Sequence, residues 1–214
     1  MALQARDWDH RYTRNTSAWT AMPPHPLVLA ELAPLVRRPE SAGAPVLDLG
    51  AGTGRHALWL AEQGCSVTAV DFSATALAHL RTRASRMGVA VRTVEADLAT
   101  YRAPEGGFRL ALISYVHPGA ADRAAMLAHA SQALAPGGAL VVVGHHRDNF
   151  AAGLDGPRDP DLMYTPDRLV AALRGLRVER AERVAHTVET EQGPREAFAV
   201  VLRAVRPPAV RPAR

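Results

Sequence analysis

The chain has 214 residues, of which 48% are hydrophobic, a length and composition that predict one sizeable folded domain and exclude wholesale disorder. All 25 basic residues are arginines and four of them lie in 203–214, so the rest of the chain carries as many acids as bases. No basic face suggests nucleic-acid binding, no apolar run suits a membrane span or signal peptide, and one cysteine excludes an internal disulfide or a cysteine-based zinc site. We therefore expect a soluble, cytoplasmic protein.

Residues 1–43 precede the regular pattern and are expected to form an N-terminal cap. The stretch RDWDHRYTRN, from Arg6, is compatible with a helix. The following SAWTAMPPHP contains three prolines and is predicted not to be a regular helix. From Pro26 the apolar spacing predicts an amphipathic helix that Pro34 should end or bend.

Strand-like and helix-like runs then alternate along the chain. The predicted strands are 45–49, 65–70, 89–94, 108–114 and 139–144, and the predicted helices are 56–63, 74–87 and 120–134. Ser73 is the expected N-cap of the second of these helices. The alternation predicts a doubly wound, Rossmann-like, mostly parallel sheet covered on both faces, whose ligand site lies at the carboxyl ends of the strands.

The last third of the chain reads differently. Residues 145–163 are rich in Gly, Pro and Asp and predict a long, lid-like loop, after which Thr165 and Pro166 should open a helix. Two strands, 176–184 and 196–205, with only a polar stretch between them, predict an antiparallel C-terminal edge hairpin. We expect a single domain over 1–205 and a disordered tail over 206–214.

The stretch VLDLGAGTG, 46–54, is the strongest functional signal. A strand, a glycine turn and a helix start place backbone N–H groups around a ligand. A nicotinamide-binding turn needs G-x-G-x-x-G, but Arg55 stands where the third glycine would fall. Asp48 would repel a pyrophosphate and attract a ligand that bears an ammonium or sulfonium group. A nicotinamide-dependent oxidoreductase is therefore the weaker alternative.

In these residues the chain resembles the class I S-adenosylmethionine-dependent methyltransferases, over about 46–143. VLDLGAGTG looks like their first motif, Asp71 in VTAVDFS stands where the family binds the ribose hydroxyls, and Asp97 in EADL stands where it contacts the adenine amine, with Leu98 beside the base. The family implies a seven-stranded sheet with the last strand antiparallel, and S-adenosyl-L-methionine as cofactor. The cofactor-binding residues expected on this basis are Asp48, Gly50, Ala51, Gly52, Gly54, Arg55, Asp71, Phe72, Asp97, Leu98 and Ser114.

The N-terminal segment adds a looser resemblance. WDHRY, Trp19, the proline-rich step and GRHALWLAEQG are similar to the tellurite-resistance and thiopurine-type small-molecule methyltransferases. In those enzymes the N-terminal segment folds over the cofactor, which implies that Trp8, Tyr12 and Arg11 lie near its methionine end. The alternative is that Trp8 and Trp19 are ordinary packing residues.

The acceptor side is less specific. Ser114–Pro118 follows the fourth strand and matches neither the Asp/Asn-Pro-Pro-Tyr pattern of amino-directed nucleic-acid methyltransferases nor a Pro-Cys nucleophile motif. His117, with an ordinary pKa near 6.5, and Tyr115 are the candidate catalytic residues; the alternative for His117 is a histidine that orders the turn. His145 and His146 follow the fifth strand, and no metal site is expected because adjacent histidines on an extended segment point opposite ways.

The sequence therefore predicts a methyltransferase that acts on a small molecule, without a nucleic-acid or membrane partner, as a monomer or homodimer. The alternatives left open are a cofactor-binding module without turnover and an RNA or protein methyltransferase. The acceptor atom is not predicted.

Overall fold

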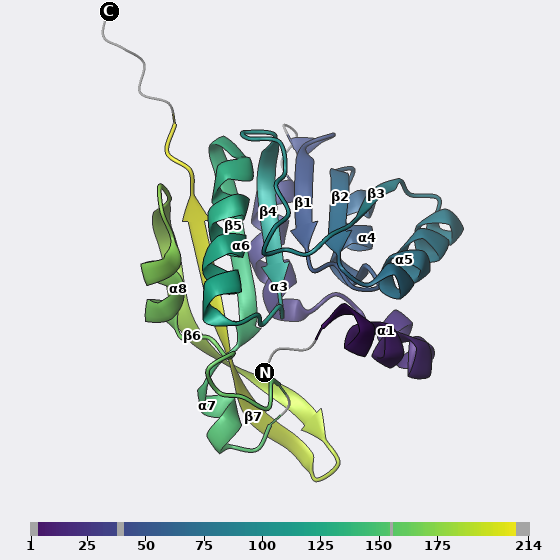
Figure 1. The fold of residues 1–214 in the computed structure, drawn as a ribbon, viewed down its shortest axis with the longest axis vertical. Helices are drawn as coiled ribbons and strands as arrows, with labels where there is room; N and C mark the ends of the chain where they lie inside the picture. Colours follow the sequence, from purple (N-terminus) through teal and green to yellow (C-terminus); the bar gives the residue numbers. More distant parts are fainter. Residues whose placement is uncertain (1–3, 38–40, 155, 209–214) are drawn as a thin grey trace, which may run out of the picture.

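The computed structural model of the chain describes residues 4–37, 41–154 and 156–208. A seven-stranded sheet runs through its centre in the order β3-β2-β1-β4-β5-β7-β6 (Figure 1). The strands are β1 (Pro45–Leu49), β2 (Ser66–Asp71), β3 (Val91–Glu95), β4 (Phe108–Ser114), β5 (Leu134–His145), β6 (Arg177–Thr190) and β7 (Gly193–Val205). The helices are α1 (Ala5–Arg14), α2 (Thr16–Ala21), α3 (Pro26–Val36), α4 (Arg55–Glu62), α5 (Ala74–Met87), α6 (Ala120–Ala133), α7 (Asp148–Ala151) and α8 (Pro166–Ala172).

The sheet confirms the predicted fold class. Strands β1 to β5 pair in parallel, whereas β7 runs antiparallel to both β5 and β6. Alternate residues of a strand point to opposite faces, so Ala111 and Ile113 pack with α6 and α8, and Leu110 and Leu112 pack with α3, α4 and α5. Burial on both faces accounts for the nearly unbroken apolar runs of the parallel strands.

The N-terminal cap corrects one prediction and narrows a second. The stretch 17–26 was predicted not to be a regular helix, yet α2 forms over Thr16–Ala21, because the first proline of the segment lies two residues beyond the helix. Pro34 lies inside α3 and does not end it. The helix continues to Val36 because Val28, Leu32 and Val36 form a fully buried stripe against the sheet, and their burial outweighs one lost backbone hydrogen bond.

The C-terminal hairpin is longer than predicted. Both strands extend through the stretch expected to be polar loop, and only residues 191–192 separate them. The last residue of β5, His145, pairs with Ala199, so the rest of the hairpin projects as a two-stranded arm beyond the carboxyl edge of the parallel strands (Figure 1).

The predicted loop 145–163 contains the short helix α7 and is fastened to this arm. The buried amide of Asn149 donates at 2.8 Å to the carbonyl of Phe198, which also accepts the N–H of His146, and the Asn149 Oδ1 accepts the N–H of Phe198 at 2.8 Å. Thr165 caps α8 as predicted, and Ser73 caps α5.

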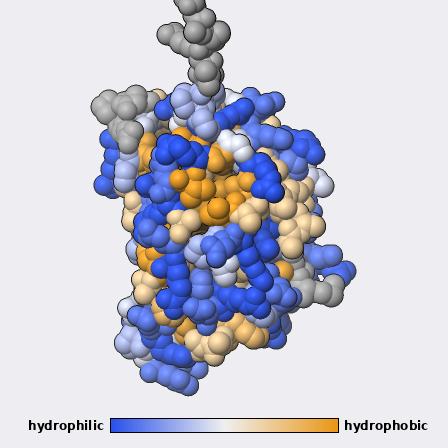
Figure 2. Space-filling model, turned by 90° about the vertical axis from the view of Figure 1, so that its left-hand side faces the viewer, coloured by the Kyte–Doolittle hydropathy of each residue, from blue (hydrophilic) through white to orange (hydrophobic). Residues whose placement is uncertain are grey.

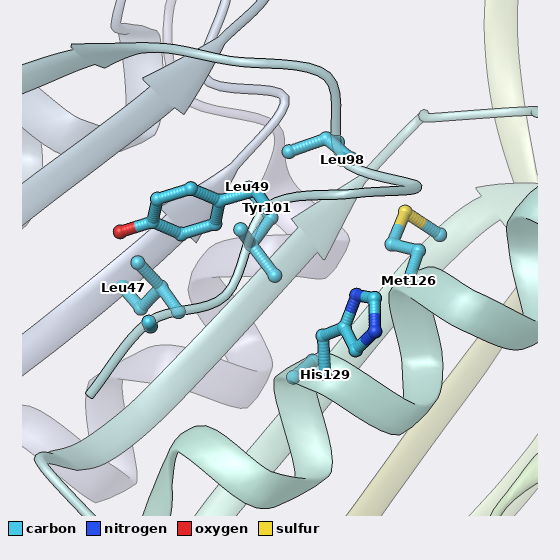
Figure 3. A pocket seen from close by; sticks show the side chains of 8 residues that line it. Leu47, Leu49, Leu98, Tyr101, Met126 and His129 are labelled. Atoms are coloured by element: carbon cyan, nitrogen blue, oxygen red, sulfur yellow. The ribbon is translucent and has the colours of Figure 1, made fainter. Parts of the chain in front are cut away.

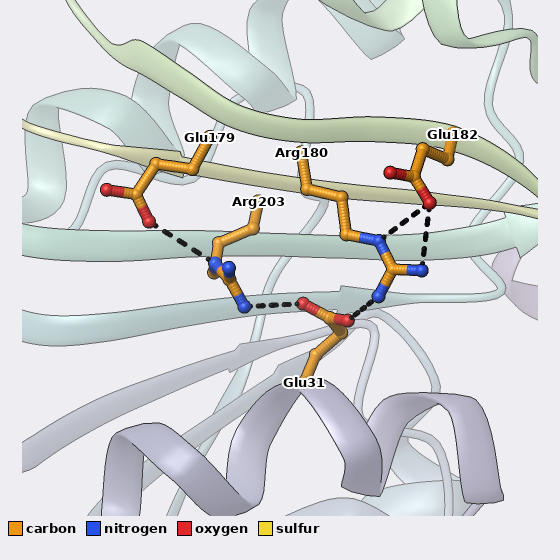
Figure 4. Close-up of polar contacts among 5 residues, drawn as sticks. All are labelled: Glu31, Glu179, Arg180, Glu182 and Arg203. Atoms are coloured by element: carbon orange, nitrogen blue, oxygen red, sulfur yellow. Dashed lines mark hydrogen bonds and ion pairs between the residues drawn. The ribbon is translucent and has the colours of Figure 1, made fainter.

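A buried carboxylate joins the N-terminal cap to the two C-terminal strands. Glu31 on α3 is 3% exposed and accepts hydrogen bonds from Arg180 of β6 and, at 3.0 Å, from Arg203 of β7. Each arginine also pairs with a second acid, Glu182 or Glu179 (Figure 4). This network holds the N-terminal cap against the C-terminal strands.

Arg206, the first residue of the predicted tail, has a backbone that pairs with Gly137 and Gly138 and a guanidinium that donates to the carbonyl oxygens of Gln132 and Leu134. Residues 209–214, the greater part of the predicted tail, lie outside the described residues.

The surface over the β6 edge is mostly hydrophilic, with hydrophobic residues gathered in its upper half (Figure 2). Strand β6 carries charged residues along its length, and charges on an edge strand disfavour pairing with another chain. Within the described part of the chain, no helix has the length and apolarity needed to cross a membrane.

Candidate active site

The glycine turn lies where β1 ends and α4 begins. Gly50, Gly52 and Gly54 all have positive φ, at 76°, 55° and 86°, a conformation that other residues rarely adopt. The N–H groups of Gly50 and Ala51 donate to the carbonyl of Val70, which fastens the turn to β2. A Cβ at Gly50 would collide with Val116, so the residues after β4 close one side of the turn.

Asp71, at the end of β2, braces the same turn. Its Oδ2 accepts the N–H of Gly52 at 2.8 Å and its Oδ1 accepts the N–H of Ser73 at 2.9 Å. Burial raises the pKa of this carboxyl, and the backbone bonds oppose the rise. Each oxygen keeps a lone pair, so the carboxylate can still accept from a pair of ligand hydroxyls.

Two buried polar atoms beside the turn have no partner within the described structure. One is Oδ2 of Asp48, in the interior of β1, and the other is Oγ of Ser114, at the end of the neighbouring β4. Burial, and then the charge of Asp71, raise the pKa of Asp48 to about 7. Buried polar atoms in proteins almost always find partners. An unpartnered carboxylate oxygen at this position fits a ligand that brings a positive charge.

The N-terminal cap lies directly against the turn. The rings of Trp8, Tyr12 and Trp19 contact one another with centroids 5.4–6.0 Å apart. The hydroxyl of Tyr12 is the group that a Cβ at Gly52 would meet, at 2.9 Å, so Tyr12 lies over the turn. Trp8 and Trp19 take part in this aromatic cluster as packing partners, and Arg11 lies over the Trp8 ring.

Asp9 of α1 fastens the cap to the first turn of α5. Its Oδ1 accepts from the hydroxyl of Ser73 at 2.5 Å and from the N–H of Thr75 at 3.2 Å. Sequence reasoning missed Asp9, because it looked only like one charge of a mixed-charge helix.

Arg55 and Tyr115 face each other across the opening of the turn. The Arg55 guanidinium lies 5.5 Å from the centroid of the Tyr115 ring; burial lowers its pKa, and the charge of Asp48 opposes the fall. Tyr115 is the one non-glycine residue with positive φ, 58°, among the residues described. Such strain persists where the surrounding structure enforces it, and it concentrates at functional sites.

The contacts of His117 favour the alternative that it orders the turn over the role of a base. Its Nδ1 bonds the carbonyl of Leu162 at 3.1 Å, and its Nε2 accepts the N–H of His145 at 3.2 Å. Burial lowers its pKa to about 3. Both ring nitrogens are thus occupied by backbone groups, in the neutral tautomer with the proton on Nδ1. Tyr164 also holds this turn, by donating to the carbonyl of Val116.

The histidines at the end of β5, His145 and His146, form no metal site with other described residues. His146 is buried, and its Nδ1 accepts the N–H of Asp148 at 3.1 Å. No cluster of His, Cys, Asp and Glu suited to a metal ion occurs in the ranges that the structure describes.

Asp97 and Leu98 follow β3 at the same edge. Asp97 is exposed, and its Oδ1 accepts the N–H of Ala99 at 2.9 Å. Leu98 lies beside Gly50 and above a narrow apolar pocket of about 190 Å³, including space open to solvent (Figure 3). Phe72, after β2, is half-buried. The pocket is lined by Leu47, Leu49, Leu98, Tyr101, Ala103, Met126, His129 and Ala130.

Comparison with known proteins agrees with this geometry. The family model of a methyltransferase domain matches residues 46–138, which include the glycine turn, Asp71, Asp97 and the end of β4. In this region the chain is similar to the class I S-adenosylmethionine-dependent methyltransferases.

The chain is 39% identical over 106 residues to the demethylmenaquinone methyltransferase of Thermus thermophilus, a match that covers 49% of the chain and 48% of the relative. It therefore spans about half the length of the curated relatives it matches.

Two solved structures extend the likeness to nearly the whole chain. One is the 1,6-didemethyltoxoflavin-N1-methyltransferase of Burkholderia thailandensis, with bound 1,6-didemethyltoxoflavin and S-adenosylhomocysteine (TM-score 0.65, 25% identity, 95% of this chain and 87% of that chain). The other, TehB of Haemophilus influenzae, has a TM-score of 0.71 at 14% identity, over 93% of this chain and 67% of that chain, and shows the shared fold.

Proposed function

We propose that this protein transfers the methyl group of S-adenosylmethionine to a small-molecule acceptor at the carboxyl edge of its sheet. The observation that carries the proposal is the buried Oδ2 of Asp48, which has no partner among the described residues, beside a turn of three glycines with positive φ. The cofactor is a cation with an ammonium group, and Asp48 offers the matching charge. Two proteins similar to this chain are named for demethylmenaquinone and 1,6-didemethyltoxoflavin, and these names support a small, planar acceptor.

The residues of the edge divide the cofactor between them. Asp71 accepts from the two ribose hydroxyls, and Asp97 accepts from the adenine amine, with Leu98 and Phe72 against the base. Asp48 and Arg55 hold the ammonium and carboxylate of the methionine part. Ser114 and the backbone of Gly50, Ala51, Gly52 and Gly54 line the turn, and Trp8 and Tyr12 close it from the cap.

The reaction needs positioning more than acid–base chemistry. The cofactor supplies an activated methyl group on a sulfonium. The chain contributes by holding the acceptor in line and by excluding water. The docked cap and the loop 145–163 contribute to both of these effects. His117 orders the acceptor-side turn, and Tyr115 presents its hydroxyl to the acceptor.

Isothermal titration with S-adenosylhomocysteine tests the cofactor site. We expect micromolar or tighter binding, lost in Asp71→Ala and retained in Asp167→Asn, which changes an acid on α8 away from the turn. Equal affinity in the wild type and Asp71→Ala, or no binding to the wild type, would refute the site.

Labelled S-adenosylmethionine tests the acceptor class. After incubation with a cell extract, the label should enter the low-molecular-mass fraction. Label recovered only in RNA or only in protein would refute a small-molecule acceptor.

A further inference from the structure

Six aromatic rings form a continuous row at the acceptor side of the site, drawn from five separate segments of the chain. Neighbouring ring centroids are 5.5, 4.9, 4.8, 5.3 and 4.5 Å apart. In order, the rings are His186, His25, Tyr115, His145, His117 and Tyr164. Tyr115 is in the middle of the row, beside the cofactor turn.

His25 determines how the Tyr115 hydroxyl is used. Its Nδ1 accepts the N–H of Leu27 at 3.3 Å and so caps α3. Its Nε2 lies 2.8 Å from the Tyr115 hydroxyl oxygen. Its backbone N–H donates to Nε2 of His56 at 3.1 Å, which fixes the segment against α4.

The tautomer of His25 follows from these bonds. Burial, and then the charge of Arg55, lower its pKa to about 4, so the ring is neutral at pH 7. Because Nδ1 accepts a hydrogen bond, the single ring proton is on Nε2 and is donated to the Tyr115 oxygen. The hydroxyl proton of Tyr115 must then be donated to some other group.

The charged side chain that contacts the Tyr115 ring is a cation. Arg55 lies over the Tyr115 ring, and the neighbouring rings, His25 and His145, are imidazoles. These residues supply a guanidinium cation, hydrogen-bond donors and flat faces; Asp48, whose charge also acts on Arg55, is assigned to the ammonium group of the cofactor. Such a set suits a planar ring that bears a negative oxygen.

We propose that Tyr115 donates its hydroxyl proton in a hydrogen bond to the anionic oxygen of a planar aromatic acceptor, and that His25 is the positioning residue that fixes this direction. The inference rests on the proposed function. In the transfer, the acceptor anion forms a bond to the methyl carbon, the carbon–sulfur bond breaks, and its electron pair stays on sulfur. The negative and positive charges cancel, so no protein base is required.

Binding of two naphthoquinones to the protein saturated with S-adenosylhomocysteine tests this assignment. The probe 2-hydroxy-1,4-naphthoquinone is an anion at neutral pH, and 1,4-naphthoquinone is its neutral counterpart. The anion should bind more tightly, and Tyr115→Phe should weaken only the anion, by about 10- to 100-fold, the effect of one hydrogen bond to a charged group.

Two variants of His25 separate positioning from folding. An asparagine amide reaches the place of Nδ1, so His25→Asn keeps the cap of α3 and loses the bond to Tyr115. A glutamine amide reaches the place of Nε2, so His25→Gln keeps the Tyr115 donor and loses the cap. We expect His25→Asn to weaken the anion about 10-fold and His25→Gln to restore its affinity.

Equal binding of the two probes, no binding of the anion, or identical behaviour of the two His25 variants would overturn the assignment. Loss of S-adenosylhomocysteine binding in the wild type would instead count against the proposed function, and the two failures are therefore distinguishable.

Discussion

Replacing Asp48 with asparagine should stabilise the ligand-free protein above pH 7 while it removes the partner for the cofactor's positive charge. Asp48 is 2% exposed, and its Oδ2 has no partner among the described residues. A rise of its pKa from 3.8 to about 7 corresponds to a cost of ~4 kcal/mol for the ionised form in the folded state. An unpaired asparagine amide would itself cost about 1–3 kcal/mol, which leaves a gain of ~1–3 kcal/mol.

The sign of the pH dependence follows from the direction of this change. A carboxyl whose pKa is raised by folding binds its proton more tightly in the folded state, so folding stability falls as pH rises from about 4 to about 7. The asparagine side chain of the variant has no proton to lose. The stability difference between Asp48→Asn and the wild type should therefore grow in favour of the variant between pH 5 and pH 8.

Urea unfolding of both proteins at pH 5 and pH 8 measures this difference. The matched control is Asp97→Asn, which changes an exposed carboxylate at the same edge and keeps the Oδ1 that accepts from Ala99. A stability difference between Asp48→Asn and the wild type that is the same at both pH values would refute the reasoning, as would an equal pH dependence in the control.

Three further changes test separate parts of the structure. Glu31→Ala leaves two partly buried arginines without their shared acceptor and should lower the free energy of unfolding by ~2–4 kcal/mol, measured by urea unfolding, with the exposed Glu182→Ala as a near-neutral control. Asn149→Ala removes both bonds to Phe198 and should cost ~2–4 kcal/mol, and hydrogen exchange should rise in the β6–β7 arm; unchanged exchange would contradict the fastening role. Gly50→Ala should abolish S-adenosylhomocysteine binding in titration, because the added Cβ collides with Val116. The double variant Gly50→Ala/Val116→Ala should recover part of the folding stability that this collision costs. A single variant with unaffected binding would contradict the tight turn.

The cofactor side was predictable because its signals are local. Each predicted residue there follows directly on a strand, and parallel strands bring their carboxyl ends to one edge whatever the details of packing. Gly50, Asp71 and Asp97 therefore lie at the same edge, at or just after the carboxyl ends of β1, β2 and β3. The prolines of the cap were over-weighted, because propensity rules do not include the burial that carries α3 through Pro34.

The acceptor side was not predictable for the opposite reason. His117 has the right residue type and position for a base, but its two nitrogens are occupied by the backbone of Leu162 and His145, 45 and 28 residues away in the chain. His25 carried one weak local signal, its place between prolines at the start of a helix. Its contact with Tyr115 spans 90 residues and exists only in the folded chain.

The division between a predictable cofactor side and an unpredictable acceptor side also limits what the relatives indicate about the acceptor. The methyltransferase-domain match ends at residue 138, so it contains every predicted cofactor residue that follows a strand, as well as Tyr115. It excludes His25, His145 and His186, which surround Tyr115 from the cap, from β5 and from the arm. Proteins that share only this central region can share the cofactor while their caps and arms select different acceptors. The affinity of this protein for its acceptor should therefore change when His25 or His186 is replaced, whereas its affinity for the cofactor should change when Asp48 or Asp71 is replaced.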